Sequence, residues 1–234
     1  NNTFQANTVV NNGGAVYIAP SASLSSMRDV FTMNKAMMGN GGAAFVTKEG
    51  QYSIISSIYD SNEAKYYGGA VFTASSDFEL TGSSIMRNNN VSEGDGGALY
   101  SSSEKSLVIS DTSFIGNTAF GTEEDMNGRG GAIAMREHNY TGFRLRLSNV
   151  TLQSNTAATN GSGLYIPQNI SVQIQGSIFQ WNHGNNSGAA IYCNTNSSAI
   201  LLNNTFQANT VVNNGGAVYI APSASLSSMR DVFT

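Results

Sequence analysis

One acidic group in the middle of the chain has the clearest capacity for chemistry. Its members are Glu93, Asp95, Glu123, Glu124 and Asp125. The first two and the last three precede successive copies of one Gly-rich motif, so a repeating fold would bring their carboxylates together. Carboxylate oxygens of this kind suit Ca²⁺. Their spacing matches no diagnostic ligand pattern and Arg129 lies close by, so the sequence favours a solvated acidic loop over a metal site.

The other groups with catalytic potential stand apart from one another. His138 and His183 fall in different loops, without a Ser or Cys partner pattern. Cys193 is the single cysteine and lies in an apolar run, which predicts a small buried side chain. Trp181 occupies a variable position, which predicts a surface residue, with a sugar-stacking platform as the alternative. Because no nucleophile, phosphate loop or metal-ligand set is recognisable, we predict a protein that is not an enzyme and needs no cofactor.

Nine Asn-x-Ser/Thr sequons are candidates for N-glycosylation. They are Asn1, Asn90, Asn139, Asn149, Asn160, Asn169, Asn185, Asn196 and Asn203. A chain this rich in Asn, Ser and Thr contains several by chance, but Asn149 and Asn203 both precede the same repeated motif, at a variable position that we expect to face solvent. Modification would make N-linked glycans partners of the protein and would imply a eukaryotic secreted chain.

The composition narrows the choice of partners. Charged residues make up 11% of the 234 residues, below the usual fraction of about a quarter, and the net charge is −4. Because there is no basic stripe, we expect no nucleic-acid partner. No apolar run approaches the ~20 residues of a membrane span, so we expect no span in this segment.

The first and last thirty-two residues are identical. Residues 1–32 and 203–234 both read NNTFQANTVVNNGGAVYIAPSASLSSMRDVFT, with an offset of 202 residues. Identity without drift, in a chain that lacks an initiator Met, indicates a section of a longer periodic array; an artificial duplication of the ends is the alternative. We therefore predict one super-repeat over residues 1–202 and the start of the next over residues 203–234.

A shorter repeat divides the long one. An aromatic or aliphatic residue is followed three positions later by Asn in FQAN, FTMN, YDSN, IMRN, FIGN, LQSN, FQWN and again FQAN. Successive copies lie 26 to 29 residues apart, except for one step of 38 residues. The recurring residues are Asn7, Asn34, Asn62, Asn88, Asn117, Asn155, Asn182 and Asn209. Seven short units thus make one super-repeat.

Each unit reads as short strands joined by turns. A Gly-rich pair and an apolar run follow each Asn, as in GGAVYI from Gly13 and GGALYS from Gly96. Ahead of Phe114, Leu107 and Ile109 alternate with polar residues, which is typical of a strand. No helical stripe of useful length is present. The sequence therefore predicts an all-β parallel β-helix, or β-solenoid, with about seven coils per super-repeat.

Stacked coils would place equivalent residues above one another at ~4.8 Å, the spacing between neighbouring strands. The Asn column predicts a ladder in which each side-chain amide bonds to the coils above and below it. A second column predicts an aromatic stack that Ala134 interrupts. It consists of Tyr17, Phe45, Phe72, Tyr100, Tyr165 and Tyr192. One coil buries too little apolar surface to fold alone, so we expect the partner to be the protein itself, end to end, with lateral bundling as an option.

The paired GGAI-type and FxxN motifs, which recur in order through all seven units, resemble the repeats of chlamydial polymorphic outer membrane proteins. The resemblance implies a right-handed parallel β-helix at the cell surface or outside the cell, in an adhesive or structural role. The perfect 202-residue super-repeat has no counterpart in that family, whose repeats are diverged.

Three functions fit these patterns. The first is the non-catalytic structural shaft of an extracellular filament built from tandem solenoid repeats. The second is a surface adhesin whose inserted loops, residues 121–129 and 136–142, recognise a ligand, since insertions in solenoids often mark the binding face. The third is a polysaccharide-cleaving enzyme, which would need acids along one strand face, whereas the acids here lie mainly in loops.

Overall fold

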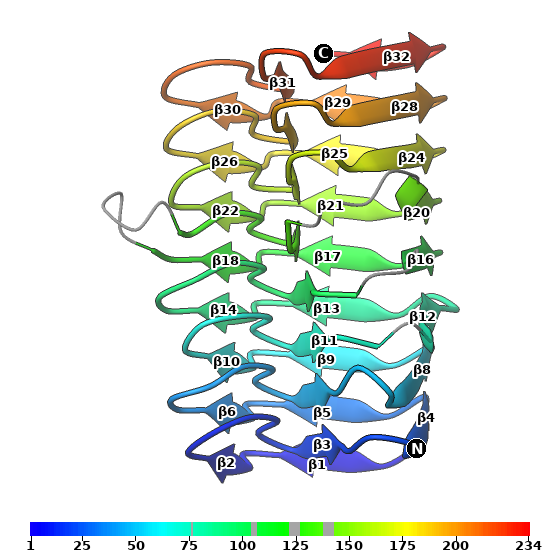
Figure 1. Ribbon diagram of the computed structural model, residues 1–234, viewed down its shortest axis with the longest axis vertical. Helices are drawn as coiled ribbons and strands as arrows, with labels where there is room; N and C mark the ends of the chain where they lie inside the picture. Colours follow the sequence, from blue (N-terminus) through cyan, green and yellow to red (C-terminus); the bar gives the residue numbers. More distant parts are fainter. Residues whose placement is uncertain (76, 104–106, 122–126, 138–142) are drawn as a thin grey trace.

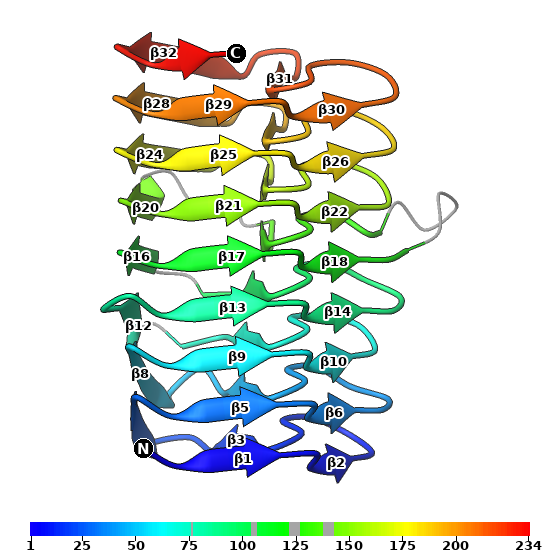
Figure 2. The same ribbon diagram turned by 180° about the vertical axis from the view of Figure 1, so that it is seen from behind.

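The chain winds as a right-handed coil of short parallel strands from one end of the molecule to the other (Figures 1 and 2). The computed structural model describes residues 1–75, 77–103, 107–121, 127–137 and 143–234. Coils 1 to 8 begin at residues 1, 28, 56, 83, 111, 149, 176 and 203, and residues 230–234 start a ninth coil. The predicted all-β parallel β-helix is therefore confirmed.

Every complete coil contributes one strand to each of four parallel sheets, here named A to D in chain order, and all of the pairings between described strands are parallel. Sheet A consists of β1 (Thr3–Gln5), β5 (Val30–Thr32), β9 (Ile58–Asp60), β13 (Ile85–Arg87), β17 (Ser113–Ile115), β21 (Thr151–Gln153), β25 (Ile178–Gln180), β29 (Thr205–Gln207) and β33 (Val232–Phe233). Sheet B consists of β2 (Thr8–Val9), β6 (Lys35–Ala36), β10 (Glu63–Ala64), β14 (Asn90–Val91), β18 (Thr118–Ala119), β22 (Thr156–Ala157), β26 (His183–Gly184) and β30 (Thr210–Val211).

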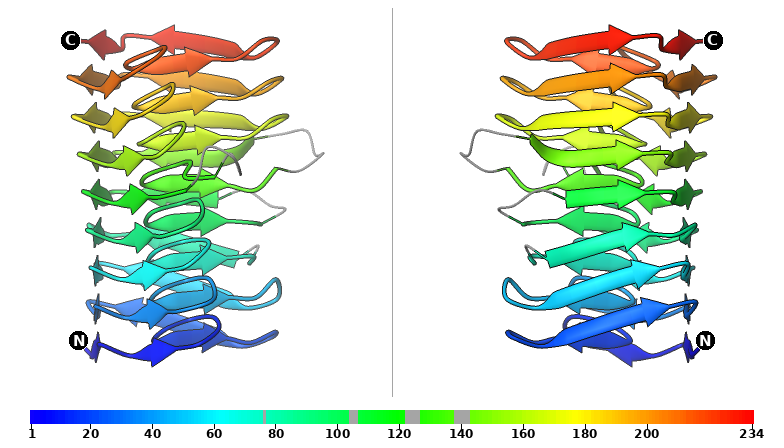
Figure 3. Two further views of the ribbon diagram at one scale, coloured as in Figure 1. Left: turned by 90° about the vertical axis from the view of Figure 1, so that its left-hand side faces the viewer. Right: turned by 90° about the vertical axis from the view of Figure 1, so that its right-hand side faces the viewer.

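The chain then turns back through the other two sheets, and the side views show the layers of strands stacked along the long axis (Figure 3). Sheet C consists of β3 (Val16–Ile18), β7 (Ala44–Val46), β11 (Val71–Thr73), β15 (Leu99–Ser101), β19 (Ile133–Met135), β23 (Leu164–Ile166), β27 (Ile191–Cys193) and β31 (Val218–Ile220). Sheet D consists of β4 (Ser23–Met27), β8 (Gln51–Ile55), β12 (Asp77–Thr81), β16 (Leu107–Ser110), β20 (Phe143–Ser148), β24 (Ser171–Gln175), β28 (Ser198–Leu202) and β32 (Ser225–Met229).

The core is a stack of apolar layers between the sheets. The middle residue of each sheet A strand points inward, and the rings of Phe31 and Tyr59 stack at 4.6 Å between their centroids. Sheets C and D add alternate residues such as Val71 and Ile54, which are fully buried. Alternation with period two thus sorts each strand into an inner and an outer face. Among the described residues, no helix is long and apolar enough to cross a membrane.

Left-handed turns change the direction of the chain between sheets. The first residue of each Gly-rich motif has a positive φ, as at Gly68 with φ 65°. A Cβ at Gly68 would overlap the carbonyl oxygen of Val71, so only glycine fits this corner. Residues of different types hold the left-handed position between sheets A and B, among them Ser61, with φ 57°, and Trp181, with φ 54°.

We expect Gly68→Ala to destabilise the protein by about 2–4 kcal/mol, because it adds left-handed strain of ~1–2 kcal/mol and a clash with the turn. Chemical denaturation followed by circular dichroism measures the change. Ser61→Ala is the control, since its exposed side chain already accepts a left-handed backbone, and it should shift stability by less than ~0.5 kcal/mol. Equal effects of the two substitutions would contradict this account of the corner.

Candidate functional site: the stacking ladders and the repeat junction

An asparagine ladder runs the length of the molecule at the turn between sheets A and B. The side-chain Nδ2 of Asn62 donates to the carbonyl oxygen of Phe31 at 3.0 Å and to Oδ1 of Asn89 at 2.9 Å. Its own Oδ1 accepts from the backbone nitrogen and Nδ2 of Asn34 at 3.0 and 2.9 Å. Each inner asparagine therefore uses all four of its side-chain hydrogen bonds while fully buried.

The structure differs from the sequence prediction at one rung. Asn89, not Asn88, occupies the ladder, because Met86 rather than Ile85 pairs with Tyr59 and Phe114 in sheet A. Asn88 instead holds the left-handed turn position with φ 54° and is exposed. Both IMRN and MRNN satisfy the motif in this coil. The spacing along the sequence distinguishes the two motifs, because Met86 lies 27 residues after Tyr59 and 28 residues before Phe114, which is the more even division. The other seven predicted residues are rungs of the ladder.

A second ladder of small polar residues lies five residues earlier, at the turn between sheets D and A. Asp29 accepts hydrogen bonds at 2.7 and 3.0 Å from the backbone nitrogen and Nδ2 of Asn2, and its own backbone nitrogen donates to Ser57 Oγ at 3.2 Å. Further along, Ser177 donates its backbone hydrogen to Asn204 Oδ1 at 2.8 Å. Sequence reasoning missed this column because its residue type varies, although a short polar residue recurs there in most units.

The aromatic column lies on the outer face of sheet C. Its rings stack in parallel, with centroid separations of 5.3 Å between Tyr17 and Phe45 and 4.7 Å between Phe45 and Phe72. Because the rings cover one another, they present mainly their edges to solvent, and they add cross-strand contacts outside the core. Tyr165 and Tyr192 continue the stack at 5.5 Å.

Ala134 interrupts the column, and two side chains from neighbouring loops fill the interruption. Tyr67 packs against Tyr100 with the ring centroids 4.5 Å apart. From the other side, the guanidinium of Arg129 lies 4.7 Å above the ring of Tyr165 and donates to its hydroxyl at 3.1 Å. Ala134 is therefore completely buried although it faces outward.

The acidic group does not form a metal site among the described residues. Asp95 forms an ion pair with Arg129, with 2.7 Å between Oδ2 and Nη2, and Glu93 lies 3.4 Å from Lys65 Nζ. No three His, Cys, Asp or Glu side chains converge within the described part of the chain. Glu123, Glu124 and Asp125 lie outside the described residues. The partner of Asp95 is therefore a cation of the protein itself.

The sequons fall in different environments. Asn149 and Asn203 sit at exposed left-handed turns between sheets D and A, and Asn196 holds the corresponding turn between sheets C and D. The half-buried Asn169 occupies that second turn one coil earlier. Three further sequons differ in exposure. Asn1 and Asn185 are exposed, whereas Asn160 is half-buried and its Oδ1 accepts a hydrogen bond from the backbone nitrogen of Ser187.

Asn90 is the sequon least open to modification. It lies on β14, and its side-chain Oδ1 is buried without a hydrogen-bond partner among the described residues. Asn139 lies outside the described residues. An exposed side-chain nitrogen is needed to carry a glycan, so the four turn positions at the corners flanking sheet D fit modification better than the strand position does.

The residues with catalytic potential that the structure describes lie apart from one another, and none of them is placed as a reactive group. The His183 ring is exposed and its Nδ1 lies 2.9 Å from Thr210 Oγ1, and Trp181 is half-exposed at a left-handed turn. Burial raises the pKa of the Cys193 thiol to about 12, so this side chain is a poor nucleophile. His138 lies outside the described residues.

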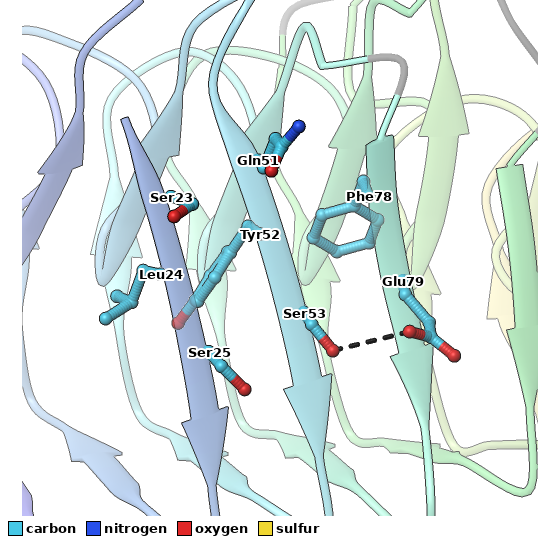
Figure 4. Close-up of a pocket in the computed structure, with 8 residues that line it drawn as sticks. All are labelled: Ser23, Leu24, Ser25, Gln51, Tyr52, Ser53, Phe78 and Glu79. Carbon is cyan, nitrogen blue, oxygen red and sulfur yellow. Dashed lines mark hydrogen bonds between the residues drawn. The ribbon is translucent and has the colours of Figure 1, made fainter. Parts of the chain in front are cut away.

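One surface hollow of about 470 Å³ lies over strands β4, β8 and β12 of sheet D. Figure 4 shows Ser25, Ser53 and Glu79 on these neighbouring strands, with Ser53 Oγ 3.4 Å from Glu79 Oε2. Glu79 is the single carboxylate among the lining residues that the structure describes. Glycoside hydrolysis usually needs two carboxylates across the scissile bond, and the described part of this hollow supplies one.

The comparison with protein families finds a match in coil 5, the coil that contains the first predicted insertion, residues 121–129. Residues 111–135 match the family described as the Chlamydia polymorphic membrane protein repeat. The match covers 25 of the 234 residues. The matched residues span β17, β18 and β19, so the repeat corresponds to most of one coil, including its ladder residue Asn117 and its Gly-rich corner. No curated protein and no solved structure matches the chain.

The junction between coils 7 and 8 joins one super-repeat to the start of the next. All four strands pair in parallel across it without a register shift. Phe179 stacks on Phe206 at 4.9 Å, Tyr192 stacks on Tyr219 at 4.9 Å, and Asn182 Nδ2 donates to Asn209 Oδ1 at 2.9 Å. Coil 7 of one period is therefore followed by the first coil of the next period, with the same kinds of contact as an inner pair of coils.

We expect Asn117→Ala to cost about 2–5 kcal/mol, because it leaves the backbone nitrogen of Asn89 buried without its acceptor and removes one hydrogen bond each from Asn89 Nδ2 and Asn155 Oδ1, at ~1–3 kcal/mol for each unpaired group. The matched control is Asn88→Ala, which removes one exposed hydrogen bond to Asp60 and should change stability by less than ~0.5 kcal/mol. Urea denaturation of both variants measures the difference. A larger loss for the Asn88 variant would reverse the ladder assignment.

Proposed function

We propose that this chain is one period of the shaft of an extracellular filament, built from polymorphic membrane protein-type coils in tandem and without a catalytic role. The single observation that carries the proposal is the junction, where residues 203–229 stack on coil 7 although their sequence is that of residues 1–27. A super-repeat that ends in a surface complementary to its own beginning can continue without a special connector.

The nature of the coil contacts supports a load-bearing role. Each pair of complete coils is joined by four parallel ladders of backbone hydrogen bonds and by an asparagine rung, and most pairs are also joined by stacked rings. These bonds run along the stack, so many of them would have to break together to separate two coils. The family name places such repeats in membrane proteins, and we infer a cell-surface or secreted setting for this chain.

The proposal predicts the axial period of the shaft. Seven coils at ~4.8 Å give roughly 34 Å for every 202 residues. We expect chains that contain one, two and three super-repeats to lengthen by that increment without thickening, as measured by small-angle X-ray scattering and electron microscopy. Separate globules connected at the junction, or an increment unrelated to 34 Å, would contradict the shaft.

A surface adhesin is the second candidate, and one observation favours it. A hollow of about 280 Å³ beside the aromatic column is lined by Tyr67, Phe72, Tyr100 and Arg136. Arg136 begins the second predicted insertion, of which residues 138–142 lie outside the described residues, as do residues 122–126 of the first. Aromatic side chains beside a cation suit recognition of a ligand.

Deletion of residues 136–142 tests the adhesin. If these residues recognise a ligand, the deletion should abolish attachment of the protein to its target cells or matrix while circular dichroism shows the same β structure. Arg146→Ala, on the outer face of sheet D, is a control for the loss of one surface arginine. Attachment that is unchanged by the deletion would remove this candidate.

A further inference from the structure

A polar hollow lies between the outer face of sheet C and the loops that lead from sheet B to sheet C. Its volume is about 360 Å³, which is within the range of sites for small ligands. The loops that follow β22 and β26 lie one above the other and form one wall, and strands β23 and β27 form the other (Figure 1). The lining includes Arg129, Asn160, Tyr165, Asn186, Tyr192 and Asn194. These six residues belong to coils 5 to 7, inside the stack.

The side-chain oxygens of the three asparagines are already occupied. Asn160 Oδ1 accepts from the backbone nitrogen of Ser187 at 3.2 Å, and Asn186 Oδ1 accepts from the side chain of Asn213 at 2.9 Å. Asn194 Oδ1 likewise accepts from the backbone nitrogen of the next residue at 2.8 Å. These bonds orient the three amides with their oxygens toward the protein and leave the amide nitrogens for a ligand.

The hollow therefore offers mainly hydrogen-bond donors. Nδ2 of Asn160 and Nδ2 of Asn186 have no acceptor among the described residues. Asn194 Nδ2 donates one of its two hydrogens to the Tyr165 hydroxyl at 3.0 Å, and Arg129 Nη1 donates to the same oxygen at 3.1 Å. Since both acceptor positions of that oxygen are used, the hydroxyl hydrogen of Tyr165 is left to donate as well. A ligand that fits this hollow is rich in acceptor atoms.

The charges around the hollow disfavour an anion. Arg129 lines the hollow, but its guanidinium is directed at Asp95, with 2.7 Å between Nη2 and Oδ2. Glu137 lies 3.9 Å from Nη1 of the same guanidinium. Two carboxylates thus surround one cation, and an acidic ligand would add a further negative charge beside them. A neutral acceptor is the better match.

We propose that this hollow binds a neutral N-acetylated sugar. The carbonyl oxygen of an acetamido group accepts hydrogen bonds and carries no charge, so it suits the amide nitrogens of Asn160 and Asn186. The Tyr192 hydroxyl has no hydrogen-bond partner among the described residues, and it accepts from the acetamido nitrogen. The rings of Tyr165 and Tyr192 stack with their centroids 5.5 Å apart, which holds both hydroxyls in place.

Sugar binding and the shaft are independent of each other. The six residues lie within one super-repeat on an outward face, so a sugar can bind whether or not super-repeats continue into a filament. Two of the candidate sequons, Asn160 and Asn185, also line the hollow. A glycan attached to either one would compete with a free sugar, so the protein for the test is produced in bacteria that add no N-glycans.

Isosteric substitutions test the site in the full chain. Asn160→Asp together with Asn186→Asp keeps both accepting oxygens and replaces the two amide nitrogens by oxygen, so two donors are lost while the fold is preserved. In titrations followed by saturation-transfer difference NMR, methyl β-N-acetylglucosaminide should bind the unsubstituted protein and bind the double variant at least about tenfold more weakly. Asn203→Asp adds a negative charge at an exposed turn between sheets D and A and should leave the affinity unchanged.

Tyr192→Phe is a second variant that keeps the ring stack, since phenylalanine occupies the same column at Phe45 and Phe72. It removes only the hydroxyl and should weaken binding about three- to tenfold. Methyl β-glucuronide, a charged sugar of similar size, should bind more weakly than the neutral probe. No binding of the neutral probe, unchanged affinity in both variants, or tighter binding of the glucuronide would overturn the proposal. The axial increment expected of tandem chains would stand in each case.

Discussion

The constraint on which this structure depends is that a coil has no stable fold without its neighbours. A coil of about 28 residues buries a single layer of side chains, which does not offset the conformational entropy lost on ordering it. The missing stability comes from contacts along the axis: backbone ladders, ring stacking and the asparagine ladder. The asparagine side chain suits this position because two donors and two acceptor sites, all facing along the axis, are all satisfied within the core.

Much of the fold could be predicted from the periodicity of the sequence. The prediction was wrong or incomplete where two adjacent residues both fit the motif and where the residue type of a column varies. The recurrence of Asn and Gly at nearly constant spacing predicted parallel coils, and alternation predicted the inward-facing residues. One rung was misplaced because Asn88 and Asn89 are adjacent and both fit the motif. The turn decides between them, since one residue must adopt a left-handed φ before the chain enters sheet B. The ladder that contains Asp29 and Ser57 was missed because hydrogen bonding there accepts several short polar residues.

Residues that were candidates for chemistry hold coils together. Asp95, a candidate metal ligand in a loop expected to be solvated, pairs with Arg129, and Arg129 in turn covers the ring exposed by the small residue Ala134. A lone sequence could not reveal this arrangement, since it joins three coils through a loop whose length varies. The identical ends, by contrast, were plain in the sequence, but only the stacked structure shows that coil 7 accepts them without a register shift.

The central claim is that hydrogen bonding along the asparagine ladder holds the stack together. Native-state hydrogen exchange of the backbone amides that donate to the ladder tests it most directly. The account predicts slow exchange of the backbone amides of Asn62, Asn89 and Asn117, with protection that decreases toward both ends of the stack. It also predicts faster exchange of the Asn89 amide when Asn117 is substituted, because Asn117 Oδ1 is the acceptor of that amide. Uniformly fast exchange of the ladder amides in the folded protein would contradict it.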